Sequence, residues 1–163
     1  MIIGVSTDDQ IAIVEDLARE IWTEHYTPII GKEQVCYMLD RFQSKGAISA
    51  QIKDEGFRYF LIGEEGRYIG YLGVLTRGEE LFLSKIYVRS SERNKGFGKK
   101  AVQFLEDLAR RQNLQKISLT VNKNNTGSVQ AYEKMGFKNL GPVVQDIGKG
   151  FIMDDFRMEK RIG

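Results

Sequence analysis

One stretch constrains the fold of this chain more than any other: a strand, a glycine-containing loop and a helix follow one another between residues 81 and 112. The segment 81–88 is rich in β-branched and aromatic residues, as strands are, and apolar residues recur at helical spacing from 101 to 108. Unpaired N–H groups and the helix dipole favour a bound anion at a helix start, typically phosphate. The loop, which predicts such an anion site, carries two glycines and four cations: Gly96, Gly98, Arg89, Arg93, Lys95 and Lys99.

Two other kinds of phosphate-binding loop fit this stretch poorly. A P-loop requires Gly, four residues and then Gly-Lys-Ser/Thr, but Arg93 stands at its first glycine and Lys100 at its hydroxyl position. The dinucleotide fingerprint is met in form over residues 96–101, yet it expects an acid about 20 residues later. The next strand ends at Asn122 instead. A glycine turn flanked by solvated charges stays open as the plain structural alternative.

The rest of the chain predicts an α/β domain. Strand 2–6 precedes a helix that starts after the N-cap Thr7 and should stop before Pro28, because the residue before proline avoids the helical region. Helices are then expected over 31–42, 45–53, 98–112 and 125–135, and strands over 58–63, 68–75, 81–88, 117–121, 138–144 and 151–160. No linker interrupts this order, so residues 1–163 are interpreted as one domain: a mixed sheet of six or seven strands with helices on both faces.

Composition narrows the class of protein. The chain has 163 residues with 42% hydrophobic and 28% charged residues, the balance of a soluble globular domain. A net charge of +2 gives no reason to expect nucleic acid. No apolar run approaches the ~20 residues of a membrane span, and the N-terminus lacks the pattern of a signal peptide. Cys36 is the only cysteine and His25 the only histidine, which predicts a cytoplasmic location, no internal disulfide and no metal site.

A second cluster of polar residues lies at 125–137. Asn125 follows a strand and begins a helix, and Ser128 and Tyr132 lie near one face of that helix. Gly136 and Phe137 then turn the chain into a strand. Taken alone, Asn125 can be an N-cap, and Tyr132 can be a core aromatic residue with its hydroxyl at the rim.

Together the two segments resemble the GCN5-related N-acetyltransferase (GNAT) superfamily. Arg93–Gly98 is similar to the R/Q-x-x-G-x-G/A loop of that family, and 125–137 is similar to its second motif. The resemblance covers roughly residues 58–160. It implies a single-domain GNAT fold and transfer of an acetyl group from acetyl-coenzyme A to an amine by direct attack in a ternary complex, without a covalent enzyme intermediate.

The resemblance also implies roles for individual residues. The backbone amides of the loop would hold the coenzyme pyrophosphate, a backbone N–H near Tyr87 and Val88 would face the thioester oxygen, and Asn125 would bind the pantetheine arm. Tyr132 would be the acid that protonates the leaving thiolate. Lys99, Lys100 and Lys134 are the alternatives for the 3′-phosphate. The implied cofactor-binding set is Ile86, Tyr87, Val88, Arg93, Asn94, Lys95, Gly96, Phe97, Gly98, Lys99, Asn125, Ser128 and Lys134.

The sequence departs from the family at the base that should deprotonate the incoming amine. Many relatives carry a glutamate on the strand before the loop, whereas the inward-facing positions here include Phe82 and Ser84. Two candidates remain for the base. Glu80 could act through a chain of waters, and His25 lies in the region that usually borders the acceptor. His25 could equally be a residue at a helix end that faces solvent.

The acceptor region is expected between the early helices and the last hairpin. Trp22, His25 and Tyr26 are candidate walls, as are Tyr37 and Met38, although Met38 fits the core better. The segment 146–155 resembles the C-terminal segment of some bacterial polyamine acetyltransferases, and its acids Asp154 and Asp155 would attract a cationic amine. A small polyamine-like amine is therefore the first prediction for the acceptor and a protein amine the second, in a monomer or homodimer.

Two alternative functions stay open. A non-catalytic sensor or interaction module could bind coenzyme A with the same fold, which the missing strand glutamate favours and the pair of Asn125 and Tyr132 disfavours. A nucleic-acid-binding domain would rest on the basic segment 89–100, but its charges are confined to one loop. Turnover of acetyl-coenzyme A with a panel of amines distinguishes the enzyme from both.

Overall fold

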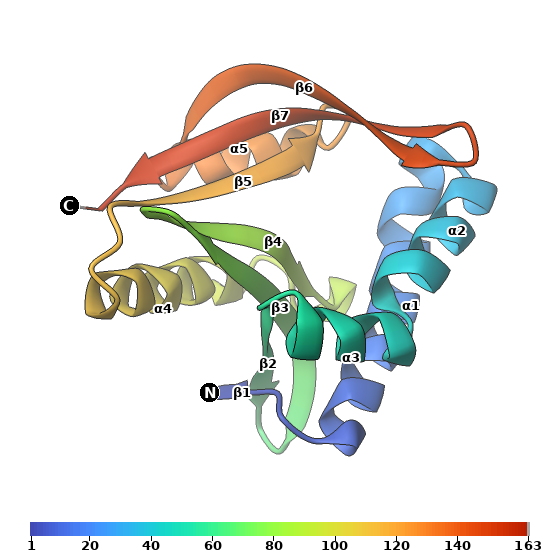
Figure 1. Ribbon diagram of the computed structural model, residues 1–163, viewed down its shortest axis with the longest axis horizontal. Coiled ribbons are helices and arrows are strands. Elements are labelled where there is room, and N and C mark those ends of the chain that lie inside the picture. Colours follow the sequence, from blue (N-terminus) through green and yellow to red (C-terminus); the bar gives the residue numbers. More distant parts are fainter. Residues whose placement is uncertain (163) are drawn as a thin grey trace. The chain divides into compact units, whose positions relative to one another are not determined.

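The computed structural model describes residues 1–162 and has an α/β fold (Figure 1). In these residues seven strands form one mixed sheet in the order β1-β2-β3-β4-β5-β7-β6, flanked by five α-helices. The strands are β1 (Ile2–Gly4), β2 (Arg58–Glu64), β3 (Arg67–Arg77), β4 (Glu80–Val88), β5 (Lys116–Asn122), β6 (Lys138–Gly148) and β7 (Phe151–Arg161). The helices are α1 (Asp8–Ile30), α2 (Lys32–Gln43), α3 (Lys45–Asp54), α4 (Phe97–Arg111) and α5 (Thr126–Lys134), with a 3₁₀ turn η1 (Ser90–Glu92). The predicted fold class is confirmed.

The chain divides into two compact units. The first contains residues 1–75 and 85–101, and the second contains residues 76–84 and the chain from 102 onward. Helices α1 to α3 and strands β1 and β2 belong to the first unit, and β5, α5, β6 and β7 belong to the second. β3, β4 and α4 contribute residues to both units, so the chain passes from one unit to the other within these elements and not through a linker. The assignment of residues 1–163 to one domain remains a prediction.

Helix α1 begins as predicted and ends later than predicted. Thr7 and Gln10 form the expected capping box, in which Gln10 N donates to Thr7 Oγ1 at 3.2 Å and Thr7 N donates to Gln10 Oε1 at 3.0 Å. The prediction that the helix stops before Pro28 is wrong, because α1 continues to Ile30. Proline in the last turn removes only one of the intrahelical hydrogen bonds. Gly31, with φ of +90°, ends the helix instead.

The second unit is built around β5. Glu80–Leu83 of β4 pair in parallel with Lys116–Leu119 of β5, and β5 pairs antiparallel with β7. The predicted alternation on β5 is confirmed, since Ile117, Leu119 and Val121 are buried. The β6–β7 hairpin is four residues longer on β6 than predicted, because Lys149 and Gly150, both at positive φ, make a tight turn after Gly148. Figure 1 shows this long hairpin in orange and red beside β5.

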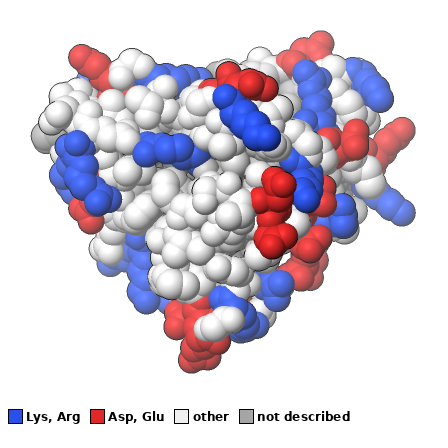
Figure 2. Space-filling view, turned by 60° about the horizontal axis from the view of Figure 1, so that its bottom comes forward, with Lys and Arg blue, Asp and Glu red and all other residues white. Residues whose placement is uncertain are grey.

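On the face shown in Figure 2, basic and acidic side chains are interspersed around an uncharged area, which gives the nucleic-acid alternative no support on that face. No helix in residues 1–162 is both long and apolar enough to cross a membrane. Within the same residues, no group of three His, Cys, Asp or Glu side chains is placed to hold a metal ion.

Candidate active site

The glycine loop joins β4 to α4 in the first unit. Its backbone is bent by left-handed residues, Asn94 with φ of +64° and Gly96 with φ of +85°. The first helical hydrogen bond of α4 runs from Lys100 N to the carbonyl of Gly96 at 3.1 Å. Gly96, just before this helix, has no side chain that could cap it, and a bound anion can accept hydrogen bonds from N–H groups of a first turn. The predicted anion-binding turn therefore has the backbone form that such a site needs.

Glu92 holds the base of this loop together. Its carboxylate is buried with 3% of the residue exposed, and it accepts hydrogen bonds from Arg67 and from Lys95 Nζ, the latter at 3.0 Å. The hydrogen bond from Lys95, together with the positive charges of Lys95 and Arg67, lowers the pKa of Glu92. One of the four loop cations is thus engaged inside the loop itself. The sequence analysis assigned no role to Glu92.

Gly98 leaves open space in the first turn of α4. A Cβ atom added there would meet no atom within 4 Å, and the residue has an ordinary helical φ. Neither packing nor backbone conformation inside the protein therefore requires glycine at this position. The exposed side chains of Lys99 and Lys100 follow directly on the helix. A glycine here allows a ligand to approach the backbone closely.

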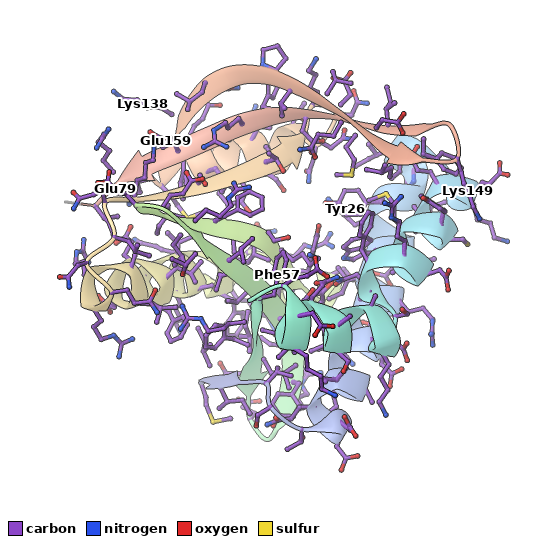
Figure 3. All side chains as sticks on the ribbon, viewed as in Figure 1. Tyr26, Phe57, Glu79, Lys138, Lys149 and Glu159 are labelled. Carbon is purple, nitrogen blue, oxygen red and sulfur yellow. The ribbon has the colours of Figure 1, made fainter. Side chains whose placement is uncertain are left out.

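An aromatic cluster brings three of the predicted residues together at the end of β4. Tyr26, which projects from α1 and is labelled in Figure 3, shares a hydrogen bond of 2.9 Å with the hydroxyl of Tyr87 on β4. The Trp22 ring centroid lies 5.6 Å from that of Tyr26 and 5.3 Å from that of Tyr87. Trp22 is buried, whereas Tyr26 and Tyr87 are half-buried. Trp22 and Tyr26, predicted to border the acceptor, thus contact Tyr87, which was predicted to bind the cofactor.

His25 lies beside this cluster. Its ring centroid is 4.9 Å from that of Tyr26, and the side chain is half-buried. Burial first, and then the positive charge of Arg93, lower the pKa of His25 below its ordinary value of 6.5. The imidazole is therefore neutral at physiological pH. The structure also brings His25 near the loop residue Arg93.

A buried hydrogen-bonded network lies in the same unit, and the sequence analysis did not identify it. Tyr71 donates to Gln43 Oε1 at 2.6 Å, Gln43 Nε2 donates to the hydroxyl of Tyr59 at 3.1 Å, and Tyr59 donates to Gln51 Oε1 at 2.5 Å. Burial raises the pKa of both tyrosines well above 10. Tyr71 also packs 5.6 Å from Tyr87 between ring centroids. The network therefore orients the Tyr71 ring that packs against Tyr87 of the aromatic cluster.

Lys85 is a second buried group that sequence reasoning missed. It lies on β4 with 9% of the residue exposed, and its Nζ is 5.1 Å from the centroid of the Phe57 ring, which Figure 3 labels. Burial lowers the pKa of Lys85 to about 8, against the opposing charge of Glu55. A cation over an aromatic face is stabilised by the ring quadrupole. Leu81, Leu83 and Lys85 alternate along β4 on its buried face, opposite Phe82 and Ser84, and this alternation was the signal that Lys85 is buried.

In the second unit, Asn125 caps helix α5. Its Oδ1 accepts a hydrogen bond from Ser128 N at 3.3 Å, and its own N–H donates to the carbonyl of Asn122 at 2.9 Å. Tyr132 is half-buried, and its ring centroid lies 5.5 Å from that of the buried Phe137. Lys134 is exposed in the last turn. The predicted N-cap and the predicted turn into β6 are both present, so the cluster at 125–137 has the expected local structure.

The remaining candidate, Glu80, is occupied by two arginines. Its carboxylate lies 3.2 Å from Arg77 and 3.1 Å from Arg157, which is on β7. The Arg77 guanidinium also lies 4.0 Å above the ring of Phe82. Phe82 and Ser84, the positions predicted to face inward, are half-buried, whereas Leu81 and Leu83 on the other face of the strand are buried. The strand itself therefore offers Glu80 only as a member of an ion-pair network.

Comparison with known families decides the class of this protein. The family model described as the acetyltransferase (GNAT) family matches residues 14–137. The chain belongs to the acetyltransferase (GNAT) family. The match begins in α1, earlier than the resemblance drawn from the two motifs, and includes the glycine loop and α5. The GNAT chain is accordingly an N-acetyltransferase.

Solved structures share its fold. The PaiA N-acetyltransferase from Thermoplasma acidophilum in complex with coenzyme A matches with a TM-score of 0.80 and 19% identity over 99% of both chains. The ribosomal-protein-S18-alanine N-acetyltransferase from Escherichia coli matches with a TM-score of 0.74 and 15% identity over 100% of this chain and 94% of that one. A spermidine N-acetyltransferase SpeG chimera from Vibrio cholerae and hSSAT matches with a TM-score of 0.74 and 20% identity over 99% of this chain and 95% of that one. A search of curated protein sequences found no match.

Proposed function

We propose that this GNAT chain transfers the acetyl group of acetyl-coenzyme A directly to a primary amine in a ternary complex. The observation that carries the proposal is the start of α4. Gly96, at positive φ just before that helix, has no side chain to cap it, and Gly98 leaves open space against its first turn. A pyrophosphate is the group for which uncapped N–H donors and a close backbone approach are suited. These residues therefore fit the coenzyme.

The residues around the loop have separate proposed tasks. The amides from Arg93 to Lys99 hold the pyrophosphate, and the exposed Lys99 is available to the 3′-phosphate, with Lys100 and Lys134 as alternatives. The backbone at Ile86, Tyr87 and Val88 binds the pantetheine arm as an added strand, with an N–H directed at the thioester oxygen. When bound, acetyl-coenzyme A supplies the acyl group as a thioester. Asn125 and Ser128 order the arm from the start of α5.

Tyr132 is the proposed acid. It lies on α5 next to the capped turn and is half-buried. A phenol of ordinary pKa near 10 can donate its proton to a thiolate that forms beside it, because the thiolate is a strong local base at the moment it leaves. Tyr132 then recovers a proton from the solvent or the product nitrogen.

A small alkyl amine of the polyamine class is the proposed acceptor, with a protein amine second. Support comes from the aromatic cluster of Trp22, Tyr26 and Tyr87, which can hold a cation against ring faces and phenol oxygens. The GNAT neighbours named for spermidine and for a ribosomal protein cover the two acceptor types. A cytoplasmic location agrees with free access to both.

The proposal is tested by release of free thiol from acetyl-coenzyme A with a panel that contains spermidine, shorter alkyl diamines and a lysine peptide. We expect turnover with at least one alkyl amine. The Tyr132→Phe variant should lose at least ~100-fold in kcat, the usual contribution of a general acid. Tyr68→Phe on β3 serves as the matched control. A Tyr132→Phe variant that keeps kcat within about threefold would remove Tyr132 from the mechanism.

Absence of any turnover, together with binding of acetyl-coenzyme A in a thermal-shift measurement, would favour the alternative of a non-catalytic sensor. The two outcomes differ in an observable quantity, since the sensor would be stabilised by the coenzyme but would release no thiol.

A further inference from the structure

The second unit carries a buried carboxylate to which the proposed function gives no task. Asp155 lies on β7 with 1% of the residue exposed. Its Oδ1 is buried and has no hydrogen-bond partner in residues 1–162. A charged group in such a place is expensive unless something pairs with it. A buried carboxylate oxygen without a partner requires an explanation, and a ligand is one.

Strand register shows which face of the sheet Asp155 shares. Asp155 is opposite Asn122 of β5, Arg157 is opposite Thr120, and Ser118 is opposite both Glu159 and Phe82. Paired residues, and every second residue along a strand, project to the same face. Asp155 thus lies on the face that carries Phe82 and Ser84 of β4. Figure 3 labels Glu159, which belongs to the same row on β7.

The opposite face of this sheet carries the helices. Lys160, which is opposite Ile117, makes an ion pair of 2.5 Å with Glu106 of α4, and it lies 3.3 Å from the position that a Cβ of Gly136, just after α5, would occupy. The face of Asp155 is therefore not the one that α4 and α5 cover.

Other charges near Asp155 are already paired. Glu80 is bound to Arg157 and Arg77, Glu159 lies 3.1 Å from Lys116, and Asp154 lies 2.8 Å from Lys123. On the partner positions of β5 and β6, Asp155 faces the uncharged residues Asn122 and Val143. Among the described residues, Asp155 is the carboxylate of this face without a basic partner. Ser118 Oγ, also fully buried, lacks a hydrogen-bond partner on the same face.

The raised pKa of Asp155 suits a proton-accepting group. Burial first, and then the charge of Asp154, raise its pKa from the ordinary 3.8 to about 6, while a hydrogen bond with Thr120 opposes the rise. A carboxylate with a pKa near the working pH is both mostly ionised at pH 7 and able to take up a proton.

We propose that the Asp155 carboxylate receives the first proton of a primary alkylammonium acceptor and is thus the base that β4 lacks. The inference rests on the proposed acetyl transfer. The ammonium gives one proton to Asp155, and the neutral nitrogen forms a C–N bond with the acyl carbon of acetyl-coenzyme A. The C–S bond breaks, the thiolate gains a proton from Tyr132, and the nitrogen loses its second proton to restore Tyr132. Asp155 releases its proton to solvent, so that each turnover yields amide, thiol and one proton.

The test compares wild type, Asp155→Asn and the control Glu159→Gln, which alters a carboxylate on the same strand and face. With spermidine or the best alkyl amine of the panel, we expect the wild-type kcat/KM to fall below about pH 6. Asp155→Asn should lose at least ~100-fold in kcat at pH 7. This deficit should shrink to below tenfold near pH 9.5, where more of the alkyl amine is already neutral. Glu159→Gln should follow the wild-type profile.

A deficit that stays the same at every pH would assign Asp155 a structural role and overturn the inference, as would a kcat within threefold of wild type. A second measurement does not need turnover. Calorimetric binding of spermidine to protein saturated with coenzyme A should weaken at least tenfold in Asp155→Asn, and equal affinity would again count against Asp155. If the wild-type protein binds the amine but releases no thiol, the proposed acetyl transfer is rejected, and the role of Asp155 as a base is rejected with it. Turnover with an unaffected variant rejects Asp155 alone.

Discussion

The Asp155→Asn substitution should stabilise the fold at neutral pH while it removes activity. Asp155 is buried, and its pKa rises from 3.8 to about 6 in the folded protein. Because each unit of pKa corresponds to about 1.4 kcal/mol, keeping this carboxylate ionised lowers the free energy of unfolding by at most ~3 kcal/mol. Relaxation of the structure around a buried charge reduces this penalty, so we expect about 1–2 kcal/mol. An asparagine of the same shape carries no charge and avoids this loss.

The sign of the pH dependence follows from the direction of the shift. Between pH 3.8 and about 6 the folded protein binds more protons at this site than the unfolded chain does, so stability falls as pH rises through that window. Above pH 6 the full loss is present. The difference between Asp155→Asn and wild type should therefore be largest at pH 7.5 and should nearly vanish at pH 4.

Urea unfolding at pH 7.5 and pH 4 measures this difference directly. A gain of 1–2 kcal/mol corresponds to roughly 2–8 °C in Tm for a chain of this size. Glu159→Gln is the control with the opposite sign, since it removes an ion pair of 3.1 Å with Lys116 and should cost up to ~1 kcal/mol. An Asp155→Asn variant that is less stable than wild type at pH 7.5, or equally shifted at both pH values, would refute the burial argument.

Two further predictions concern the first unit. Gly98→Ala should weaken coenzyme A binding at least tenfold without loss of stability, because its Cβ meets no protein atom but fills the space beside the first turn of α4. The control is Gly46→Ala, at the second residue of α3, where the space is equally open. Equal affinity of the two variants for coenzyme A in calorimetry would remove Gly98 from the site. His25→Ala should raise KM for the amine severalfold and leave the acidic limb of the pH–rate profile in place, since burial and Arg93 keep its pKa low. Loss of that limb would make His25 the base instead of Asp155.

Much of the fold could be predicted because each element carries its own signal. The capping box at Thr7 and Gln10, the alternation on β5 and the glycine turn after α5 are all local patterns. The errors came where tertiary context overrode a local rule. Pro28 is accommodated in the last turn of α1, and β6 extends to Gly148 because β7 supplies hydrogen-bond partners along its whole length.

The site divides in the same way. The glycine loop and the Asn125 cap could be predicted, since each is a contiguous motif with a backbone reason for its residues. The Tyr59–Tyr71 network could not, because its hydrogen bonds link residues from four separate elements. Asp155 was noticed only as part of an acidic pair. Its isolation from basic partners depends on the β5–β7 register and on which neighbouring acids already have an arginine or lysine.

The same register explains why β7 can supply a base on the sheet face that Phe82 and Ser84 of β4 share. At the position of Phe82 an acid would lie beside Arg77, whose guanidinium now covers the ring at 4.0 Å, and close to the Glu80–Arg157 pair. A carboxylate bound by arginine has a lowered pKa and is a poor proton acceptor at pH 7. Asp155 has Asp154 as its charged neighbour in sequence, which moves its pKa in the opposite direction. On these electrostatic grounds, β7 is the better place for a base in this chain.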